Sequence, residues 1–461
     1  MRDACRSAAP SPFRLAKRGR GIRANIEVQP PLEKAILVGA PRKGSPDARA
    51  LEEHLAELAR LVDTAGADVV GRLSQQLAAI SPATLIGEGK VEELRLLCVE
   101  MGATLVVFDE ELSPVQGQNL EAELKVRVMD RAEIILDIFA TRARSHEAKL
   151  QVELAQMRYM LPRLKRMWTH LSRIRGGIGL RGPGETQLET DRRMIRKKIS
   201  YLVEKLRDWE RHRDTVRAGR ETMLTAALVG YTNAGKSSLL RSFSGEHDIF
   251  VEDRLFATLD TLTRTVDLGE GYKARMTDTV GFIRKLPHHL VASFRATLEE
   301  ARAADVLLHV VDASHPEWQE QVVVVQGVLE ELGLGEHPVL MVFNKLDAVP
   351  DETPFVRDAQ RDYADAQFTS TLRTDGIFAL KRALRERAKA GRVTARVLVP
   401  FALAGRAASL YREAEVLERQ DGEHGTELLV RAEAWQFERL REAGFEVRVP
   451  DVMTAAAGDA A

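Results

Sequence analysis

The stretch "GYTNAGKSS", Gly230 to Ser238, follows the apolar run "LTAALV" and precedes the helical pattern "SLLRSF". A strand, a glycine-containing loop and a helix in this order form the setting that a phosphate-binding loop requires. Gly230 and Gly235 let backbone N–H groups turn toward phosphate oxygens, Lys236 reaches the β- and γ-phosphates, and the Ser237 hydroxyl can ligate Mg²⁺. The loop therefore predicts a nucleotide-binding α/β domain, and we assign to nucleotide contact the residues Gly230, Tyr231, Thr232, Asn233, Ala234, Gly235, Lys236, Ser237 and Ser238.

The phosphate-binding loop alone leaves ATP and GTP open, and a second motif favours GTP. The tetrapeptide "NKLD" supplies Asn344, Lys345 and Asp347 after the strand-like run "VLMVF". The carboxylate of Asp347 can accept hydrogen bonds from both N1–H and the exocyclic amine of guanine, whereas adenine offers no such pair of donors. Further along, "FTSTL" offers Ser370 and Thr371 as a turn that contacts the base. We predict a guanine-nucleotide site.

Two stretches between these motifs have the character of nucleotide switches. In "DTVG", Asp278 would hold the metal through water and the Gly281 N–H would meet the γ-phosphate, while Thr258 in "LFATLD" would ligate Mg²⁺ only when the γ-phosphate is present. The next residue is Phe282, where many GTPases carry a glutamine that positions water. No catalytic side chain can be assigned, so we expect slow basal hydrolysis, with the missing polar group supplied by a rearranged loop or by a partner.

Size and composition restrict the class of protein. A chain of 461 residues is expected to form two to four domains. A hydrophobic fraction of 44% and a charged fraction of 29% describe a globular protein, and the sequence lacks an apolar run long enough to cross a membrane. Cys5 and Cys98 are too few and too far apart for a disulfide framework or a zinc site. We expect a cytoplasmic protein.

Positive charge is concentrated in one segment that has the periodicity of paired helices. Residues 142–220 hold 21 Lys or Arg against nine Asp or Glu, although the whole chain has a formal net charge of only -1. Apolar residues recur at steps of three and four on both sides of the glycine-rich stretch "RIRGGIGLRGPGE". This pattern predicts an antiparallel helical hairpin with helices on the order of 35 Å long. Pro162 is expected to kink the first helix, and Trp168 and Trp209 to lie in the seam between the two.

These patterns divide the chain into five parts. Alternating strand and helix patterns indicate α/β domains, and the last part contains a strand at "RVTARVLVP" and a helix through "GRAASLYREAEVL". The predicted fold class is α/β, with a P-loop GTPase domain preceded by a small α/β domain and a long antiparallel helical hairpin and followed by a small α+β appendage. The predicted boundaries are 1–33 for a disordered basic leader, 34–140 for the N-terminal α/β domain, 141–220 for the hairpin, 221–390 for the GTPase domain and 391–461 for the C-terminal domain.

Several of these motifs together resemble one family. The phosphate-binding loop, "LFATLD" and "DTVGFI" followed by "LP" are similar to those of the HflX family of translation-associated GTPases. The resemblance extends through "VVFDEELSPVQGQNLE", "DRAEIILDIFATRARSHEAKLQVELAQMRYMLPRL" and "GGIGLRGPGETQLETDRR" and covers roughly residues 34–380. It implies a monomeric GTPase that binds the large ribosomal subunit, is stimulated by the ribosome, and helps to dissociate stalled or hibernating ribosomes. It also implies ATP hydrolysis by the N-terminal region.

The resemblance gives the basic hairpin a partner, because a cluster of positive charge gains affinity for RNA by releasing counterions. The glycine-rich tip would approach rRNA closely, and membranes would be reached only through ribosomes. A GTP-dependent factor for large-subunit assembly and an RNA-remodelling ATPase stay open as alternatives. The predicted contacts with the ribosome are Gly176, Gly177, Gly179, Arg181, Gly182, Gly184, Arg192, Arg193, Arg196 and Lys197.

Overall fold

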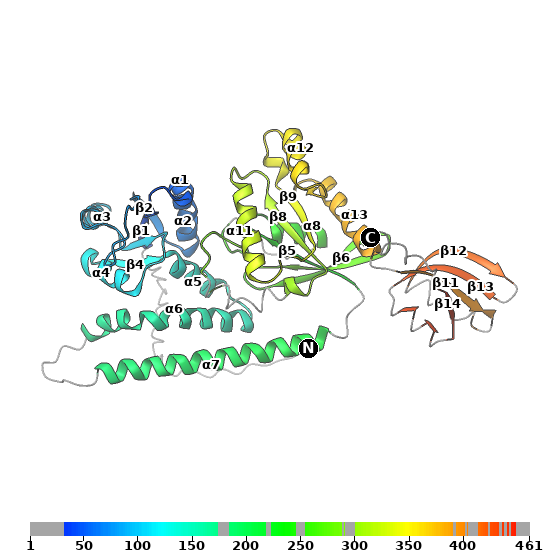
Figure 1. The fold of residues 1–461 in the computed structure, drawn as a ribbon, viewed down its shortest axis with the longest axis horizontal. Helices are drawn as coiled ribbons and strands as arrows, with labels where there is room; N and C mark the ends of the chain where they lie inside the picture. Colours follow the sequence, from blue (N-terminus) through cyan, green and yellow to red (C-terminus); the bar gives the residue numbers. More distant parts are fainter. Residues whose placement is uncertain are drawn as a thin grey trace, which may run out of the picture.

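A chain of three sheet-containing units and one helical hairpin makes up the structure (Figure 1). The computed structural model describes residues 32–173, 184–217, 223–245, 254–287, 290, 300–390, 393–401, 403, 414–422, 425–432, 436–437, 440–441 and 444–448. The predicted fold class is confirmed. The expected leader lies outside the described residues up to position 31.

The N-terminal unit is a parallel four-stranded sheet in the order β2-β1-β3-β4. Helix α2 covers it with an apolar stripe that includes Leu55, Leu58 and Leu61, and the helix ends at Gly66, whose φ of 91° is the left-handed conformation that stops a helix. The strands are β1 (Lys34–Gly39), β2 (Asp68–Ser74), β3 (Leu105–Phe108) and β4 (Arg127–Asp130). The helices are α1 (Pro46–Arg49), α2 (Leu51–Ala65), α3 (Glu88–Met101), α4 (Pro114–Leu124) and α5 (Arg131–Arg142).

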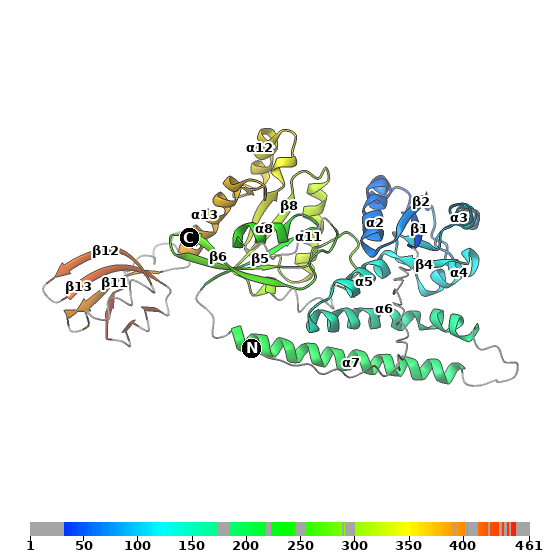
Figure 2. The same ribbon diagram turned by 180° about the vertical axis from the view of Figure 1, so that it is seen from behind.

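The helical hairpin consists of α6 (His146–Arg173) and α7 (Gly184–Arg217). Helix α6 contacts α4 and α5 of the N-terminal unit, and views from opposite sides show it lying between that unit and α7 (Figures 1 and 2). Leu154, Leu202 and Leu206 are buried in the seam. At 1.5 Å per residue, α7 is about 50 Å long, which exceeds the expected 35 Å.

Two residues of the hairpin lie in other positions than the sequence predicted, and the side chain of a third is not described. Gly184, expected in the flexible tip, is the first residue of α7, a position whose N–H needs no partner within the helix. Trp209 is not a seam residue: it is 40% exposed and lies 6.1 Å from the ring of His146, where α6 begins and the covering helix ends. The side chain of Trp168 lies outside the described side chains, and α6 continues through Pro162.

The nucleotide domain is a six-stranded sheet in the order β10-β9-β8-β5-β7-β6, parallel except for the edge strand β6. The residues "LTRTVDLG" of β6 were not predicted as a strand. The strands are β5 (Leu224–Gly230), β6 (Leu262–Gly269), β7 (Tyr272–Asp278), β8 (Val306–Asp312), β9 (Val339–Asn344) and β10 (Gln367–Phe368). The described helices are α8 (Lys236–Ser244), α11 (Trp318–Glu331), the short η1 (Leu346–Ala348), α12 (Glu352–Asp362) and α13 (Thr374–Ala390).

The C-terminal unit is an antiparallel sheet in the order β12-β13-β11-β14, at the end of the molecule away from the N-terminal unit (Figure 1). Its strands are β11 (Val393–Pro400), β12 (Glu415–Gly422), β13 (Gly425–Ala432) and β14 (Glu446–Arg448). The predicted helix through residues 405–417 is wrong at its end, because residues 415–417 belong to strand β12, which pairs with β13. Residues 405–413 lie outside the described residues.

The N-terminal unit and the nucleotide domain share one continuous apolar core. Phe139 of α5 meets the Phe256 ring edge to face, with ring centres 4.8 Å apart. Phe282 and Tyr231 of the nucleotide domain belong to the same buried cluster. Because this core joins the two units directly at the predicted switch stretches, their relative position is coupled to the nucleotide site.

A buried ionic cluster lies at the same interface. The guanidinium of Arg131 at the start of α5 bonds to Glu57 and, at 2.8 Å, to Asp109. Tyr231 of the phosphate-binding loop donates its hydroxyl hydrogen to Glu57, and Lys285 forms an ion pair with Asp109. Burial opposes the charge on Arg131, but the two carboxylates raise its pKa on balance. Glu57 and Asp109 of the N-terminal unit therefore each bond to a residue of both units.

Removal of this guanidinium should leave Glu57 and Asp109 as buried, poorly compensated charges. We expect Arg131→Ala to lower the free energy of unfolding by about 3–5 kcal/mol, as for other broken buried ion pairs. The measurement is a urea titration of the purified chain, followed by far-ultraviolet circular dichroism.

The matched control is Arg127→Ala, which removes a guanidinium from the adjacent strand β4. Arg127 is 46% exposed and its ion pair with Glu133 is at the surface, so this change should cost less than about 1 kcal/mol. Equal losses for the two variants would contradict a structural role for the buried cluster.

Candidate nucleotide-binding site

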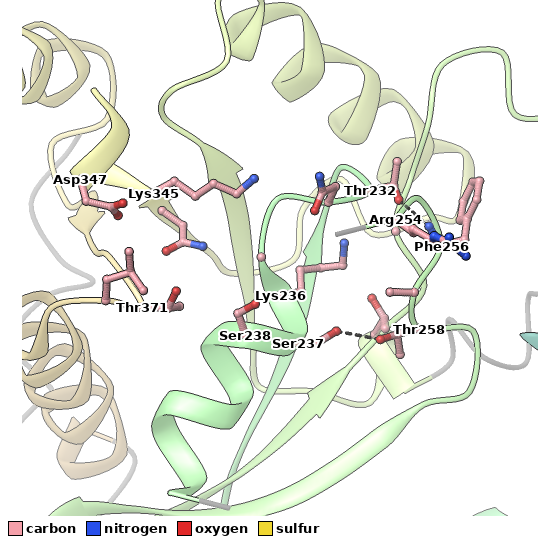
Figure 3. Close-up of a pocket in the computed structure, with 17 residues that line it drawn as sticks. Thr232, Lys236, Ser237, Ser238, Arg254, Phe256, Thr258, Lys345, Asp347 and Thr371 are labelled. Carbon is pink, nitrogen blue, oxygen red and sulfur yellow. Dashed lines mark hydrogen bonds between the residues drawn. The ribbon is translucent and has the colours of Figure 1, made fainter. Parts of the chain in front are cut away.

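A cavity of about 500 Å³ lies where the sheet of the nucleotide domain ends at its phosphate-binding loop (Figure 3). It receives residues from five separated stretches of chain: the loop and the start of α8, the segment 254–258, the residues just after β7, the end of β9 with the residues that follow it, and the residues after β10. The lining residues are Thr232, Asn233, Gly235, Lys236, Ser237, Ser238, Arg254, Phe256, Ala257, Thr258, Thr279, Gly281, Asn344, Lys345, Asp347, Thr371 and Leu372.

Gly235 and Lys236 maintain the conformation of the phosphate-binding loop. Gly235 has a φ of 91°, and a Cβ atom there would lie 2.3 Å from Nδ2 of Asn344. Lys236 is buried and donates hydrogen bonds to the carbonyl oxygens of Gly230 and Tyr231 at 3.1 and 2.9 Å. Burial lowers the pKa of the Lys236 amine to about 8, an effect that a bound polyphosphate would counteract. The loop thus presents the cationic side chain of Lys236 to the cavity.

Three side-chain oxygens converge beside Lys236. The Ser237 hydroxyl lies 2.7 Å from the Thr258 hydroxyl and donates to Oδ2 of Asp278 at 2.6 Å. The other carboxylate oxygen of Asp278 is buried without a hydrogen-bond partner among the described residues. Burial raises the pKa of this carboxyl, although Lys236 and the hydroxyls act in the opposite direction. An uncompensated buried carboxylate oxygen next to two hydroxyls is an arrangement suited to a hard cation.

The segment 254–260 contacts the phosphate-binding loop as well as the N-terminal unit and the chain before α6. The Phe256 N–H donates to Oγ1 of Thr232 at 2.9 Å, and the Phe256 ring is buried against the N-terminal unit. Asp260 accepts hydrogen bonds from the backbone N–H groups of Arg144 and Ser145 at 2.9 and 3.2 Å, immediately before α6. This switch segment therefore joins the phosphate-binding loop to the base of the hairpin.

The segment after β7 lies directly on the phosphate-binding loop. Phe282 and Tyr231 form an isolated parallel bridge, in which the Thr232 N–H donates to the Phe282 carbonyl at 2.6 Å and the Phe282 N–H donates to the Gly230 carbonyl at 3.0 Å. A Cβ at Gly281 would lie 2.7 Å from Cα of Thr232, so only glycine fits. The Phe282 ring is 1% exposed, lies in the shared apolar core and does not line the cavity.

The opposite end of the cavity carries the residues predicted to contact the base. Lys345 forms an ion pair with Asp312 at 2.7 Å, and the Ser370 hydroxyl donates to Asp347. Asn344 is fully buried and donates to the Ala234 carbonyl at 3.0 Å, so it ties this end to the phosphate-binding loop. Figure 3 shows Asp347, Lys345 and Thr371 on one side of Lys236, with Thr258 on the other.

Most of the predicted nucleotide contacts line the cavity, and five of them do not. Gly230, Tyr231 and Ala234 do not line it: Tyr231 turns its ring into the interdomain core, and Ala234 is buried. Asp278 and Ser370 reach it through Ser237 and Asp347. Lining residues that sequence reasoning missed are Arg254, Phe256, Ala257, Thr279 and Leu372. The position of Arg254 next to "LFATLD", of Phe256 and Ala257 within it, and of Thr279 within "DTVG" was the available signal for the first four.

The predicted ribosome contacts lie far from this cavity along the chain and only partly within the described residues. Arg192, Arg193, Arg196 and Lys197 are on α7, and Gly184 is its first residue. The remaining predicted contacts lie outside the described residues: Gly176, Gly177, Gly179, Arg181 and Gly182.

Comparison with known proteins identifies the family. Three family models match in order: "GTP-binding GTPase N-terminal" over residues 52–140, "GTP-binding GTPase Middle Region" over 142–220, and "50S ribosome-binding GTPase" over 225–345. "GTPase HflX" of Escherichia coli strain K12 is 44% identical over 370 residues, which are 80% of this chain and 86% of that protein. The chain belongs to the HflX family of GTPases.

Other HflX proteins are similarly close. "GTPase HflX" of Magnetococcus marinus is 43% identical over 409 residues, covering 88% of this chain and 94% of that protein. Among solved structures, a GTP-binding protein of Sulfolobus solfataricus in complex with GDP is 23% identical, with a TM-score of 0.41 and coverage of 77% of this chain and 99% of that one. As an HflX-family member with a P-loop domain, the chain is a GTP-hydrolysing enzyme.

Two further findings concern sites and segments of other kinds. Within the described ranges, no group of three or more His, Cys, Asp or Glu side chains is arranged to hold a metal ion. The helices in those ranges also lack the combination of length and apolar character that crossing a membrane requires.

Asp347 should determine the choice of base. Asp347→Asn replaces one acceptor oxygen by a donor, so GTP should lose at least about 2 kcal/mol of binding free energy, or about 30-fold in affinity, while xanthosine triphosphate should bind more tightly. Competition titrations against a fluorescent guanine nucleotide measure both effects.

Asp351→Asn is the matched control. This exposed carboxylate is four residues along the chain, outside the cavity, and its loss should leave both affinities unchanged. Unaltered GTP affinity in Asp347→Asn would show that Asp347 does not contact the base.

Proposed function

We propose that this HflX-family GTPase binds the large ribosomal subunit through rRNA contacts on α7 and promotes dissociation of stalled or hibernating ribosomes. Hydrolysis would be slow in the free protein and faster on the ribosome, and the protein would act in the cytoplasm as a monomer. The model "50S ribosome-binding GTPase", which matches the nucleotide domain, supports a ribosomal partner.

The observation that carries the proposal is a row of basic side chains on α7. Arg192 and Arg196, and likewise Arg193 and Lys197, are one helical turn apart, and the four together occupy one broad face of the helix. None of the four forms an ion pair with a described residue, whereas the neighbouring Lys198 pairs with Glu153 of α6 at 3.1 Å. Like charges at this spacing destabilise an isolated helix, and a polyanion would relieve their repulsion.

The nucleotide site supports Mg²⁺ as the cofactor of hydrolysis. The hydroxyls of Ser237 and Thr258 would ligate the ion and Asp278 would hold it through water, which fits the unpartnered carboxylate oxygen described above. When bound, the metal neutralises charge on the β- and γ-phosphates. Lys236 would contribute a second positive charge, and the Gly281 N–H would meet the γ-phosphate. In support, Gly281 lines the cavity, and a Cβ there would lie 3.1 Å from Nζ of Lys236.

Sedimentation of intact ribosomes through sucrose gradients tests the proposed function. With the protein and a non-hydrolysable GTP analogue, free subunits should accumulate, with the protein on the large one. Replacement of residues 176–184 by a short turn should retain binding but reduce subunit release. Intact ribosomes in both cases would refute dissociation, and a peak of protein on immature large subunits would favour an assembly factor.

The basic face of α7 should determine binding to the ribosome. Reversal of its four free cations to glutamate should weaken binding to large subunits by about tenfold or more and reduce the steepness of the salt dependence. In a plot of log affinity against log salt concentration, loss of four phosphate contacts lowers the magnitude of the slope by about 3. The residues changed are Arg192, Arg193, Arg196 and Lys197.

The control reverses four surface cations elsewhere and so matches the change in net charge. Both variants should bind GTP like the unaltered protein, because none of the changed residues lines the nucleotide cavity. Equal loss of ribosome binding in the two variants would indicate a general effect of net charge. The control residues are Arg95, Arg357, Arg361 and Arg382.

A further inference from the structure

The geometry of Phe282 leaves the hydrolysis reaction without a polar group at the position where many GTPases have one. Its ring is buried between the two domains and does not line the cavity. A phosphoryl-transfer site still needs positive charge on the oxygens that carry the developing negative charge. The source of this charge can be sought among the cations around the cavity.

Other described cations near the phosphate end already have partners. Lys236 is bound to two carbonyl oxygens of the phosphate-binding loop. Beyond the loop, Arg284 bonds to Glu317 and Glu320 at 2.7 and 3.0 Å, and Lys285 pairs with Asp109. These two side chains are held by the interdomain contacts and do not line the cavity.

Arg254 is different from these cations. It lines the cavity, its side chain is exposed, and no ion pair joins it to a carboxylate among the described residues. Figure 3 shows it on the side of Lys236 where Thr258 lies, opposite the base-contacting residues. Its charge is therefore available at the phosphate end of the site.

The backbone next to Arg254 is bonded to the phosphate-binding loop. Phe256, two residues later, is bonded to Thr232 of the phosphate-binding loop, and two residues of chain span at most about 7 Å. Phe256 has a φ of 54°, an unfavourable conformation for an aromatic residue, and its buried ring offsets the cost. The turn sends this ring into the interdomain core while Arg254 and Thr258 on either side of it line the cavity.

We infer that Arg254 is a catalytic residue, an arginine supplied by the switch segment of the same chain that donates N–H groups, in the transition state, to the transferring γ-phosphoryl group and the β–γ bridging oxygen. In the reaction, the oxygen of a water molecule bonds to the γ-phosphorus and the bond from that phosphorus to the bridging oxygen breaks. The electron pair stays on GDP, and the water's protons pass to inorganic phosphate and solvent. Arg254 stabilises the charge that grows on the bridging oxygen.

Single-turnover hydrolysis and binding of a transition-state analogue test this role in the full-length chain without ribosomes. Arg254→Ala should slow hydrolysis of bound GTP by about 30-fold, the ratio between GTPases with and without an arginine in cis. Affinity for GTP should change less than about twofold. GDP with aluminium fluoride, which resembles the transferring phosphoryl group, should bind tightly to the unaltered chain and weakly to the variant. Arg254→Lys should recover only part of either effect, because an ammonium cannot bond two oxygens in the plane of a guanidinium.

Arg241→Ala is the matched control, since Arg241 is an exposed arginine on α8 outside the cavity, and it should behave like the unaltered chain. Hydrolysis and aluminium fluoride binding within twofold of normal in Arg254→Ala would overturn the inference, as would a loss confined to GTP affinity. The inference rests on the nucleotide site described above. Failure of that site would appear as absent GTP binding in the unaltered chain, whereas failure of the inference would appear only in the comparison of variants.

Discussion

Arg131 holds two buried carboxylates, and each of them also binds a donor from the nucleotide domain. Glu57 accepts from Tyr231 of the phosphate-binding loop, and Asp109 pairs with Lys285 just beyond the second switch segment. Because an uncompensated charge in this buried place is costly, the four partners can separate only if water or other ions replace them. The N-terminal unit is thus bonded both to the phosphate-binding loop and to the chain just beyond the second switch segment.

The switch segments are fastened to the N-terminal side as well as to the nucleotide side. Phe256 contacts Phe139, Asp260 binds the chain just before α6, and the Phe282 ring lies in the same core. Rearrangement around the nucleotide therefore changes the packing of the interdomain core, and a force on that core changes the nucleotide site. This reciprocity follows from shared contacts and does not depend on a long pathway through the molecule.

Local patterns were sufficient to predict the elements that carry the site, and long-range contacts were not. The apolar runs before the phosphate-binding loop and before "NKLD" became β5 and β9, because buried parallel strands are apolar throughout. The edge strand β6 was missed because exposed threonine and aspartate residues and a half-buried arginine interrupt its apolar character. The contact of Tyr231 with Glu57 joins residues 174 positions apart, and no periodicity within either stretch indicates it. The exposure of Trp209 likewise depends on where the partner helix begins.

The hairpin also has mechanical properties. Both helices are linked to the nucleotide domain at the base of the hairpin: α6 begins one residue after the contact of Ser145 with Asp260, and α7 ends shortly before β5. Because α6 also packs on α4 and α5, the hairpin would turn together with the N-terminal unit, and a rotation of about 5° would displace the far end of a rigid rod of about 50 Å by about 4 Å. Conversely, a force on the far end of the hairpin would act as a torque on the contacts at its base, including that of Asp260. The arm is therefore a lever whose short side is the first switch segment.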